Sequence, residues 1–221
     1  MEKRRLFDIE TDNLLSKVTK LWIVYILDVD TGHKWLFRPG EMGWKKILDE
    51  SDVLIGHNIQ GYDIPVLEKL TGWKPSPETR IHDTLILSQI LDYKRFGLKG
   101  HSLATWGEHL GFPKIHFDDF SEFTENMVTY CERDIDLNFL VYKQVMAEYI
   151  RLSEKSPQLG SYIKAEHAVA KWCSKSSLHG WPFDLERAKS LMRELEGELK
   201  EAHRRLSARL GMKTVAIDKC K

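Results

Sequence analysis

The chain of 221 residues is 42% hydrophobic, which allows one full domain and an appendage at ~100–200 residues per domain. Basic and acidic residues number 33 each, so the chain lacks the net positive charge that is typical of nucleic-acid binders. Any such binding must be local or assisted by metal ions. The three cysteines (Cys131, Cys173 and Cys220) form no CxxC pattern, so we expect no disulfide framework and no zinc site. No apolar run suits a signal peptide or reaches the ~18 residues of a membrane span, so we expect a cytoplasmic protein.

The first predicted strand covers residues 5–10 and carries two carboxylates, Asp8 and Glu10. Residues two apart share one face of a strand, so both acids should project side by side. Like charges this close repel and call for a cation. The alternative is a solvent-facing pair on an edge strand, since most acidic side chains are exposed. The choice depends on carboxylates further along the chain.

Residues 20–37 predict a β-hairpin with its turn at 28–33, which makes three consecutive antiparallel strands with the first one. A short helix at 44–48 and a short apolar strand at 53–55 follow. This strand leads into residues 57–63 at its carboxyl end, where open α/β sheets hold their functional sites.

Pro65 is tolerated only in the first turn of a helix, so the next helix begins near Asp63, beside the loop that follows the strand. After a loop at 73–79, residues 80–82 predict a further strand. Asp83 can then cap a helix that runs to Leu91. Asp63 is therefore expected at a helix start next to a strand end.

Residues 92–101 form a cationic loop that includes Lys94 and Arg95. These are ordinary solvated charges by default, but near a site they would hold phosphates. Ser102 caps the next helix, which Gly111 ends.

A long helix is predicted from Thr124, and in it Tyr130 and Asp134 lie one turn apart on the same face. Residues 151–160 are polar and contain proline and glycine, which predicts a linker. Beyond it, helices at 162–178 and 184–210 carry one apolar stripe each. Two such helices need a further surface to pack against.

Four carboxylates thus stand out: Asp8, Glu10, Asp63 and Asp134. In a sheet of the ribonuclease H kind they would meet at one end, as hard oxygen ligands that suit Mg²⁺ or Mn²⁺. Two such ions ~3.5–4 Å apart can activate a water and stabilise the leaving oxygen of a phosphoryl transfer. Tyr130, with an ordinary pKa of ~10, is a poor base near neutral pH, so we assign it the orientation of that water.

Three segments resemble, in the correct order, the motifs of the DEDD 3′→5′ exonucleases: Asp8-Ile9-Glu10, His57-Asn58-x-x-x-Tyr62-Asp63-x-Pro65-x-Leu67 and Tyr130-x-x-x-Asp134. The sister subtype has a histidine five residues before the last aspartate, where this chain has Thr129, so the tyrosine subtype is indicated. Three further segments narrow the resemblance to the proofreading exonuclease of family A DNA polymerases from short-tailed bacteriophages: Asp83-Thr84-Leu85-x-Leu87-Ser88, Ala104-x-Trp106-Gly107 and Asp118-Asp119-Phe120. The resemblance covers about residues 4–150.

The resemblance implies an α/β fold, with a ribonuclease H-like mixed sheet flanked by helices and a C-terminal helical extension. We expect an exonuclease domain at 1–150, a linker at 151–160 and, at 161–221, a helical segment similar to the start of a family A polymerase domain. In that segment Glu166-His167-x-x-Ala170 and His179-Gly180-Trp181-Pro182-Phe183-Asp184-x-x-x-Ala188 carry the similarity. Palm, fingers and thumb are absent, so either a separate chain carries them and docks through residues 161–221, which we favour, or the sequence is a truncated piece.

The expected activity is metal-dependent hydrolysis of phosphodiesters at DNA 3′ ends, for proofreading in phage DNA replication, in the host cytoplasm if the gene belongs to a phage. Two divalent cations, Mg²⁺ or Mn²⁺, are the expected cofactors. We expect Asp8 to bind both ions and Glu10 to bind the water-activating one. The expected catalytic residues are Asp8, Glu10, Asp63, Tyr130 and Asp134, the four carboxylates among them as metal ligands, and the expected substrate contacts are Thr11, Asn58, Lys94 and Arg95.

Several residues keep alternative interpretations. Asn58 is as well explained by a turn as by contact with the substrate strand, and His57 is expected to be packed rather than a ligand. We interpret Asp83, Asp118 and Asp119 as structural. Two other functions stay open: a free-standing RNA-trimming nuclease of the same superfamily, and a subunit that mainly docks a separate polymerase chain.

Overall fold

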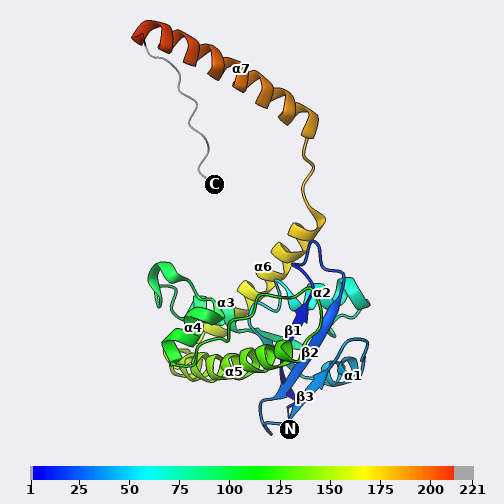
Figure 1. The fold of residues 1–221 in the computed structure, drawn as a ribbon. Coiled ribbons are helices and arrows are strands. Elements are labelled where there is room, and N and C mark those ends of the chain that lie inside the picture. Colours follow the sequence, from blue (N-terminus) through cyan, green and yellow to red (C-terminus); the bar gives the residue numbers. More distant parts are fainter. Residues whose placement is uncertain (1, 212–221) are drawn as a thin grey trace. The chain divides into compact units, whose positions relative to one another are not determined.

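A computed structural model describes residues 2–211 and contains a mixed five-stranded sheet in the order β3-β2-β1-β4-β5 (Figure 1). The strands are β1 (Arg4–Thr11), β2 (Leu21–Asp28), β3 (Lys34–Phe37), β4 (Val53–Gly56) and β5 (Arg80–Asp83). β1 pairs antiparallel with β2 and parallel with β4, while β2 pairs antiparallel with β3 and β4 parallel with β5. The predicted mixed sheet is confirmed, with the acidic strand β1 at its centre.

Several helices begin or end at the capping residues that the sequence predicts. They are α1 (Trp44–Asp49), α2 (Asp63–Thr71), α3 (Thr84–Leu91), α4 (Leu103–Leu110), α5 (Glu125–Ser153), α6 (Leu159–His179) and α7 (Leu185–Leu210), with a short 3₁₀ helix at Gly97–Lys99. Asp83, Ser102 and Thr124 each accept a backbone N–H at the start of their helix. Gly111 ends α4 with φ 65°.

Each face of the sheet is covered by helices, and β1 contributes alternate residues to both. Phe7 and Ile9 pack in one core with Trp44 of α1 and Leu67 of α2. Leu6 packs on the opposite face in a second core with residues of α5, such as Cys131. Asp8 and Glu10 follow Leu6 at two-residue steps, so they share the face covered by α5.

The segment between α5 and α6 covers residues 154–158, inside the predicted linker at 151–160. The chain divides into two compact units between His179 and Gly180, so α6 belongs to the first unit. The reason is a buried contact: the Asp83 backbone N–H donates to His167 Nε2 of α6 at 2.9 Å.

The second unit holds α7. Asp184 caps the N-terminus of this helix, because its carboxylate accepts from the Arg187 backbone N–H. Its leucines are 45–67% exposed, from Leu191 at the low end to Leu199 at the high end. The apolar stripe predicted for this helix is therefore uncovered within the described residues. Residues 212–221, which include Cys220, lie outside them.

Within residues 2–211, no helix combines the length and apolar character needed to cross a bilayer. Cys131 is buried and Cys173 exposed, and neither forms a disulfide.

Candidate active site

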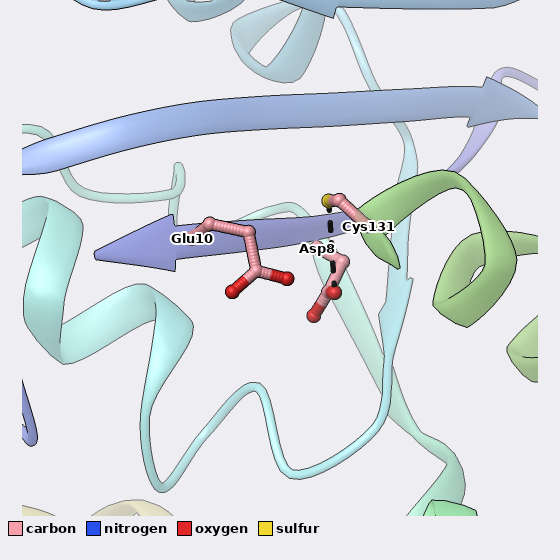
Figure 2. Close-up of side chains that lie close together, drawn as sticks. All are labelled: Asp8, Glu10 and Cys131. Carbon is pink, nitrogen blue, oxygen red and sulfur yellow. Dashed lines mark hydrogen bonds between the residues drawn. The ribbon is translucent and has the colours of Figure 1, made fainter. Parts of the chain in front are cut away.

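Asp8 and Glu10 project from the same side of β1 (Figure 2). The Cys131 thiol of α5 donates to Asp8 Oδ2 at 3.8 Å, the contact drawn as a dashed line in Figure 2. One ligand atom from each of these three residues lies within 4.8 Å of the others. Burial raises the pKa of Cys131 well above its ordinary range, so the thiol stays protonated and acts as a donor.

Asp63 enters the site from the first residue of α2 and is 3% exposed. Its carboxylate reaches across to the sheet, where Oδ1 accepts from the Ile9 backbone N–H at 3.2 Å. Ile9 lies between the two acids of β1. Asp63 is therefore held against the β1 pair, as expected of a helix start beside the strand ends.

Asp134 enters from α5, one turn after Tyr130 as predicted. Its Oδ2 lies 2.6 Å from Lys114 Nζ, and the same ammonium donates to the Tyr130 hydroxyl at 2.9 Å. Its Oδ1 is buried and has no hydrogen-bond partner among the described residues. One carboxylate oxygen of Asp134 is thus left bare.

Lys114 is the residue of this site that the motifs miss. It comes from the segment 111–124 between α4 and α5, in which the motif residues begin only at Asp118, four positions further on. The only sequence signal is indirect: four clustered carboxylates need a positive charge. We call Asp8, Glu10, Asp63 and Asp134 the carboxylate cluster.

The carboxylate cluster holds protons more tightly than isolated acids do. Burial, then the charge of Asp134, raises the pKa of Asp8 to about 7, against the opposing ammonium of Lys114. Burial and the neighbouring Asp8 raise the pKa values of Glu10 and Asp63 well above their ordinary range. Burial also raises the pKa of Asp134, while Lys114 opposes the shift. Such a group of acids is unfavourable when fully ionised and without cations.

Tyr130 is also shifted: burial and the charge of Asp134 raise its pKa to about 12. Its phenol is therefore neutral near pH 7 and can donate or accept a hydrogen bond but not remove a proton. This supports the orienting role predicted for it.

The residues present fit a divalent cation. Mg²⁺ prefers carboxylate oxygens, and the cluster offers several, among them the bare Oδ1 of Asp134. A dication would also relieve the repulsion that raises the pKa values of these acids.

A cavity of about 530 Å³ opens beside the cluster and is lined by Glu10, Thr11, Tyr62 and the segment 118–121, among others. Thr11 Oγ1 and the Tyr62 hydroxyl lie within hydrogen-bond distance of each other and of the Asn13 carbonyl, so one hydroxyl donates to the carbonyl and the other donates to the first hydroxyl. Thr11 is therefore placed at the wall of this cavity. Asp118 and Asp119 are exposed on its rim and do not join the cluster.

The loop between β4 and α2 depends on Asp83. The carboxylate of Asp83, 1% exposed, accepts from the backbone N–H groups of Asn58 (2.8 Å), Gln60 (3.1 Å) and Leu85 (3.1 Å). Asn58 has φ 64°, a left-handed conformation that asparagine tolerates. The turn role of Asn58 and the structural role of Asp83 are thus evident. His57 is packed as expected: it hydrogen-bonds Thr84 through Nδ1, and burial lowers its pKa to about 4.

Lys94 and Arg95 are not brought to the cluster with the other residues. The Arg95 guanidinium pairs with Glu148 and lies over the Trp106 ring at 4.9 Å. Glu148 is 14 residues after Asp134 on α5, about 21 Å along the helix axis. Arg95 therefore has an internal partner far from the acids, while Lys94 is exposed.

No family model matches the chain. Over 92% of its length the chain is 27% identical to a DNA-directed DNA polymerase of Enterobacteria phage T3 and 26% identical to that of Escherichia phage T7. It spans 37% of the length of each polymerase.

Two solved nucleases share the fold. NrnC of Brucella melitensis matches with TM-score 0.61 and 19% identity, over 84% of this chain and 90% of its own. The Escherichia coli exoribonuclease RNase D matches with TM-score 0.55 and 18% identity, over 79% of this chain and 46% of its own. NrnC has been solved with bound Mg²⁺ and with bound pGG. The comparisons confirm the predicted mixed sheet flanked by helices, a fold shared with these solved structures, and the predicted resemblance to part of a phage DNA polymerase.

Proposed function

We propose that this chain is a metal-dependent 3′→5′ exonuclease that hydrolyses phosphodiesters at DNA 3′ ends as the proofreading part of a phage-type DNA polymerase. The observation that carries this proposal is the convergence of four carboxylates from β1, α2 and α5, three of them buried and Asp8 half-buried, beside an open cavity that Glu10 lines. The similarity to phage polymerases over 92% of the chain supports DNA as the substrate.

The proposed metal ligands are Asp8, Glu10, Asp63 and Asp134, with Asp8 contacting two ions, Mg²⁺ or Mn²⁺, and Glu10 contacting the one next to the attacking water. When bound, the ions lower the pKa of that water and stabilise the leaving oxygen. That NrnC, of the same fold, binds Mg²⁺ supports this choice.

The side chains around the cluster supply position rather than acid or base chemistry. Tyr130 keeps its proton and can hold the attacking water through its hydroxyl. Thr11 and Asn58, at the wall of the cavity and on the adjacent loop, are proposed to contact the terminal nucleotides. Lys94 and Arg95 stay candidates for phosphate contacts further along the strand.

We also propose that a separate chain carrying the polymerase domain docks on residues 161–221. The described part of this segment exposes apolar side chains on α6, such as Trp172 at 63%, and on α7, such as Leu195 at 55%. The similar polymerases are much longer than this chain, so we propose that a domain corresponding to the rest of their sequence packs on these apolar faces. Such a complex would work in the host cytoplasm.

Docking is tested by co-expressing the chain with the reading frame that follows it in the genome. We expect a stable complex by gel filtration, loss of that complex in Leu195→Glu, and unchanged exonuclease activity of the isolated variant. A neighbouring frame without polymerase motifs would rule out the separate-chain arrangement.

The function itself is tested with 3′-labelled single strands of DNA and RNA of one sequence. We expect Mg²⁺-dependent release of mononucleotides, faster from DNA, and no release in EDTA. Faster digestion of RNA would favour an RNA-trimming nuclease, to which the RNase D fold is equally suited. Cleavage that survives chelation, or that survives Asp8→Ala combined with Glu10→Ala, would contradict the proposal, and the chain would then act mainly by docking.

A further inference from the structure

Lys114 is a cation placed inside the carboxylate cluster by the chain itself. Its ammonium lies 2.6 Å from Asp134 Oδ2 and 2.9 Å from the Tyr130 hydroxyl, and its side chain is 26% exposed. Its charge acts on Asp8 and Glu10 as well as on Asp134. Within residues 2–211, no other lysine or arginine forms an ion pair with an acid of the cluster.

The segment that carries Lys114 is anchored on both sides. One residue before it, the Pro113 carbonyl accepts from Arg133 Nε of α5 at 2.9 Å. After it, Phe117 packs on the Tyr130 ring at 5.4 Å between centroids. Lys114 is thus held over the cluster by its backbone, while its long, flexible side chain can leave Asp134 for water.

Resting on the proposed exonuclease function, we propose that Lys114 is an internal counter-ion that stands in for a divalent cation at Asp134 and competes with it. In the absence of metal, the ammonium neutralises part of the charge of the four acids and keeps the cluster folded. When an ion arrives, it must displace the ammonium from Asp134 or bind beside a positive charge. In either case Lys114 weakens metal binding and stabilises the metal-free protein.

The competing interpretation is that Lys114 only orients Asp134, as the outer partners of metal ligands do. The two interpretations predict opposite changes in metal affinity when the Lys114 ammonium is removed. An orienting partner strengthens metal binding, so its removal weakens it, whereas the removal of a competing charge strengthens it. The affinity for the metal alone therefore distinguishes them without any measurement of cleavage.

The test is calorimetric titration of the full-length chain with Mn²⁺ at pH 8, for the wild type, Lys114→Met and Lys114→Arg. We expect the methionine variant to have an Mn²⁺ affinity at least about tenfold higher than that of the wild type. The arginine variant, which keeps the charge, should have the affinity of the wild type. In EDTA, the methionine variant should melt at a lower temperature than the wild type, and Mn²⁺ should remove most of this difference.

Lys34→Met is the matched control. Lys34 also bridges two acids of α5, Glu132 at 2.9 Å and Asp136 at 2.8 Å, but contacts none of the carboxylate cluster. It should leave Mn²⁺ affinity unchanged. Equal or weaker Mn²⁺ binding by Lys114→Met would overturn the proposal, whereas a wild type that binds no Mn²⁺ would instead overturn the exonuclease function on which it rests.

Discussion

The Ile9 backbone N–H donates to Asp63 Oδ1 at 3.2 Å, across 54 residues of sequence. Because Ile9 lies between Asp8 and Glu10, this one bond sets the position of the α2 acid relative to the β1 pair. Asp63 therefore has two roles, a structural one through this bond and a chemical one through its negative charge. An asparagine would keep the first and lose the second, since an amide oxygen can accept the same bond but carries no charge.

The change Asp63→Asn should keep the fold but strongly reduce the rate of cleavage. We expect a melting temperature equal to or above that of the wild type in EDTA, because one repelling charge is gone, and a loss of about 10²–10³-fold in kcat, the size seen when one transition-state contact is removed. Asp63→Ala, which also loses the Ile9 bond, should melt lower. Wild-type cleavage by Asp63→Asn would exclude Asp63 from the chemistry.

The metal-free protein should lose stability as the pH rises from 7 to 8.5. A carboxyl group whose folded-state pKa is raised stabilises the fold while it is protonated, and this contribution is lost between its unfolded-state pKa and its folded-state pKa. For Asp8 these values are 3.8 and about 7, so its loss is completed in this interval, and Glu10 and Asp63, whose pKa values are raised well above their ordinary range, add a loss of the same sign. The lowered pKa values of His57 and His82 act only below this window.

Thermal melts in EDTA at pH 7 and 8.5 check this. The melting temperature should fall with pH, fall less in Asp8→Asn, and become nearly independent of pH with saturating Mg²⁺. A melting temperature in EDTA that rises over this interval would show that the acids are not confined together.

The elements of the fold were predictable because their signals are local. Asp83 and Thr124 each begin a helix with a side chain that accepts a nearby N–H, and Pro65 can stand only in a first turn. Asp8 and Glu10 could be placed together because a strand alternates its faces. These features depend on a few adjacent residues.

What was missed depends on contacts between distant segments. Lys114 is not part of any motif, and its place at Asp134 is set by contacts between the segment 111–124 and α5. The attachment of α6 to the first unit was not predictable, because His167, in a helix without a strong apolar face, is held by the buried backbone of Asp83. The pairing of Arg95 with Glu148 was not predictable either, because the two residues lie 53 positions apart.

Replacing Asp83 with alanine should destabilise the protein and impair cleavage together. Three backbone N–H groups around the Asn58 loop lose their acceptor, and each buried unsatisfied group costs about 1–3 kcal/mol. Asp92→Ala is the control, since that exposed carboxylate also accepts one backbone N–H, from Lys94. Urea unfolding should show a large loss for the first variant and little for the second; equal losses would contradict the organising role of Asp83.

Replacing Arg95 with alanine should reduce the stability of the protein. The change leaves the part-buried Glu148 without its main partner and uncovers the Trp106 ring, so we expect a loss of roughly 1–3 kcal/mol. Lys94→Ala should change stability little. Measured binding of single-stranded DNA over a range of salt concentrations decides the matter: if Arg95→Ala lowers the salt dependence at unchanged stability, Arg95 contacts phosphate instead.

Replacing Tyr130 with phenylalanine should lower kcat by about 10²-fold, the effect of a reactant misplaced by a small distance. Because the pKa of Tyr130 is about 12, its phenol does not ionise in the working range, so the pH dependence of the remaining activity should keep the shape of the wild type. A phenol acting as a base would instead give a wild-type rate that rises with pH toward 12, with this limb absent in the variant. Tyr142→Phe on the same helix is the matched control, since its hydroxyl bonds His82 at 3.0 Å, and it should leave kcat unchanged. Equal effects of the two changes would mean that loss of a hydroxyl from α5, rather than orientation of the water, explains the defect.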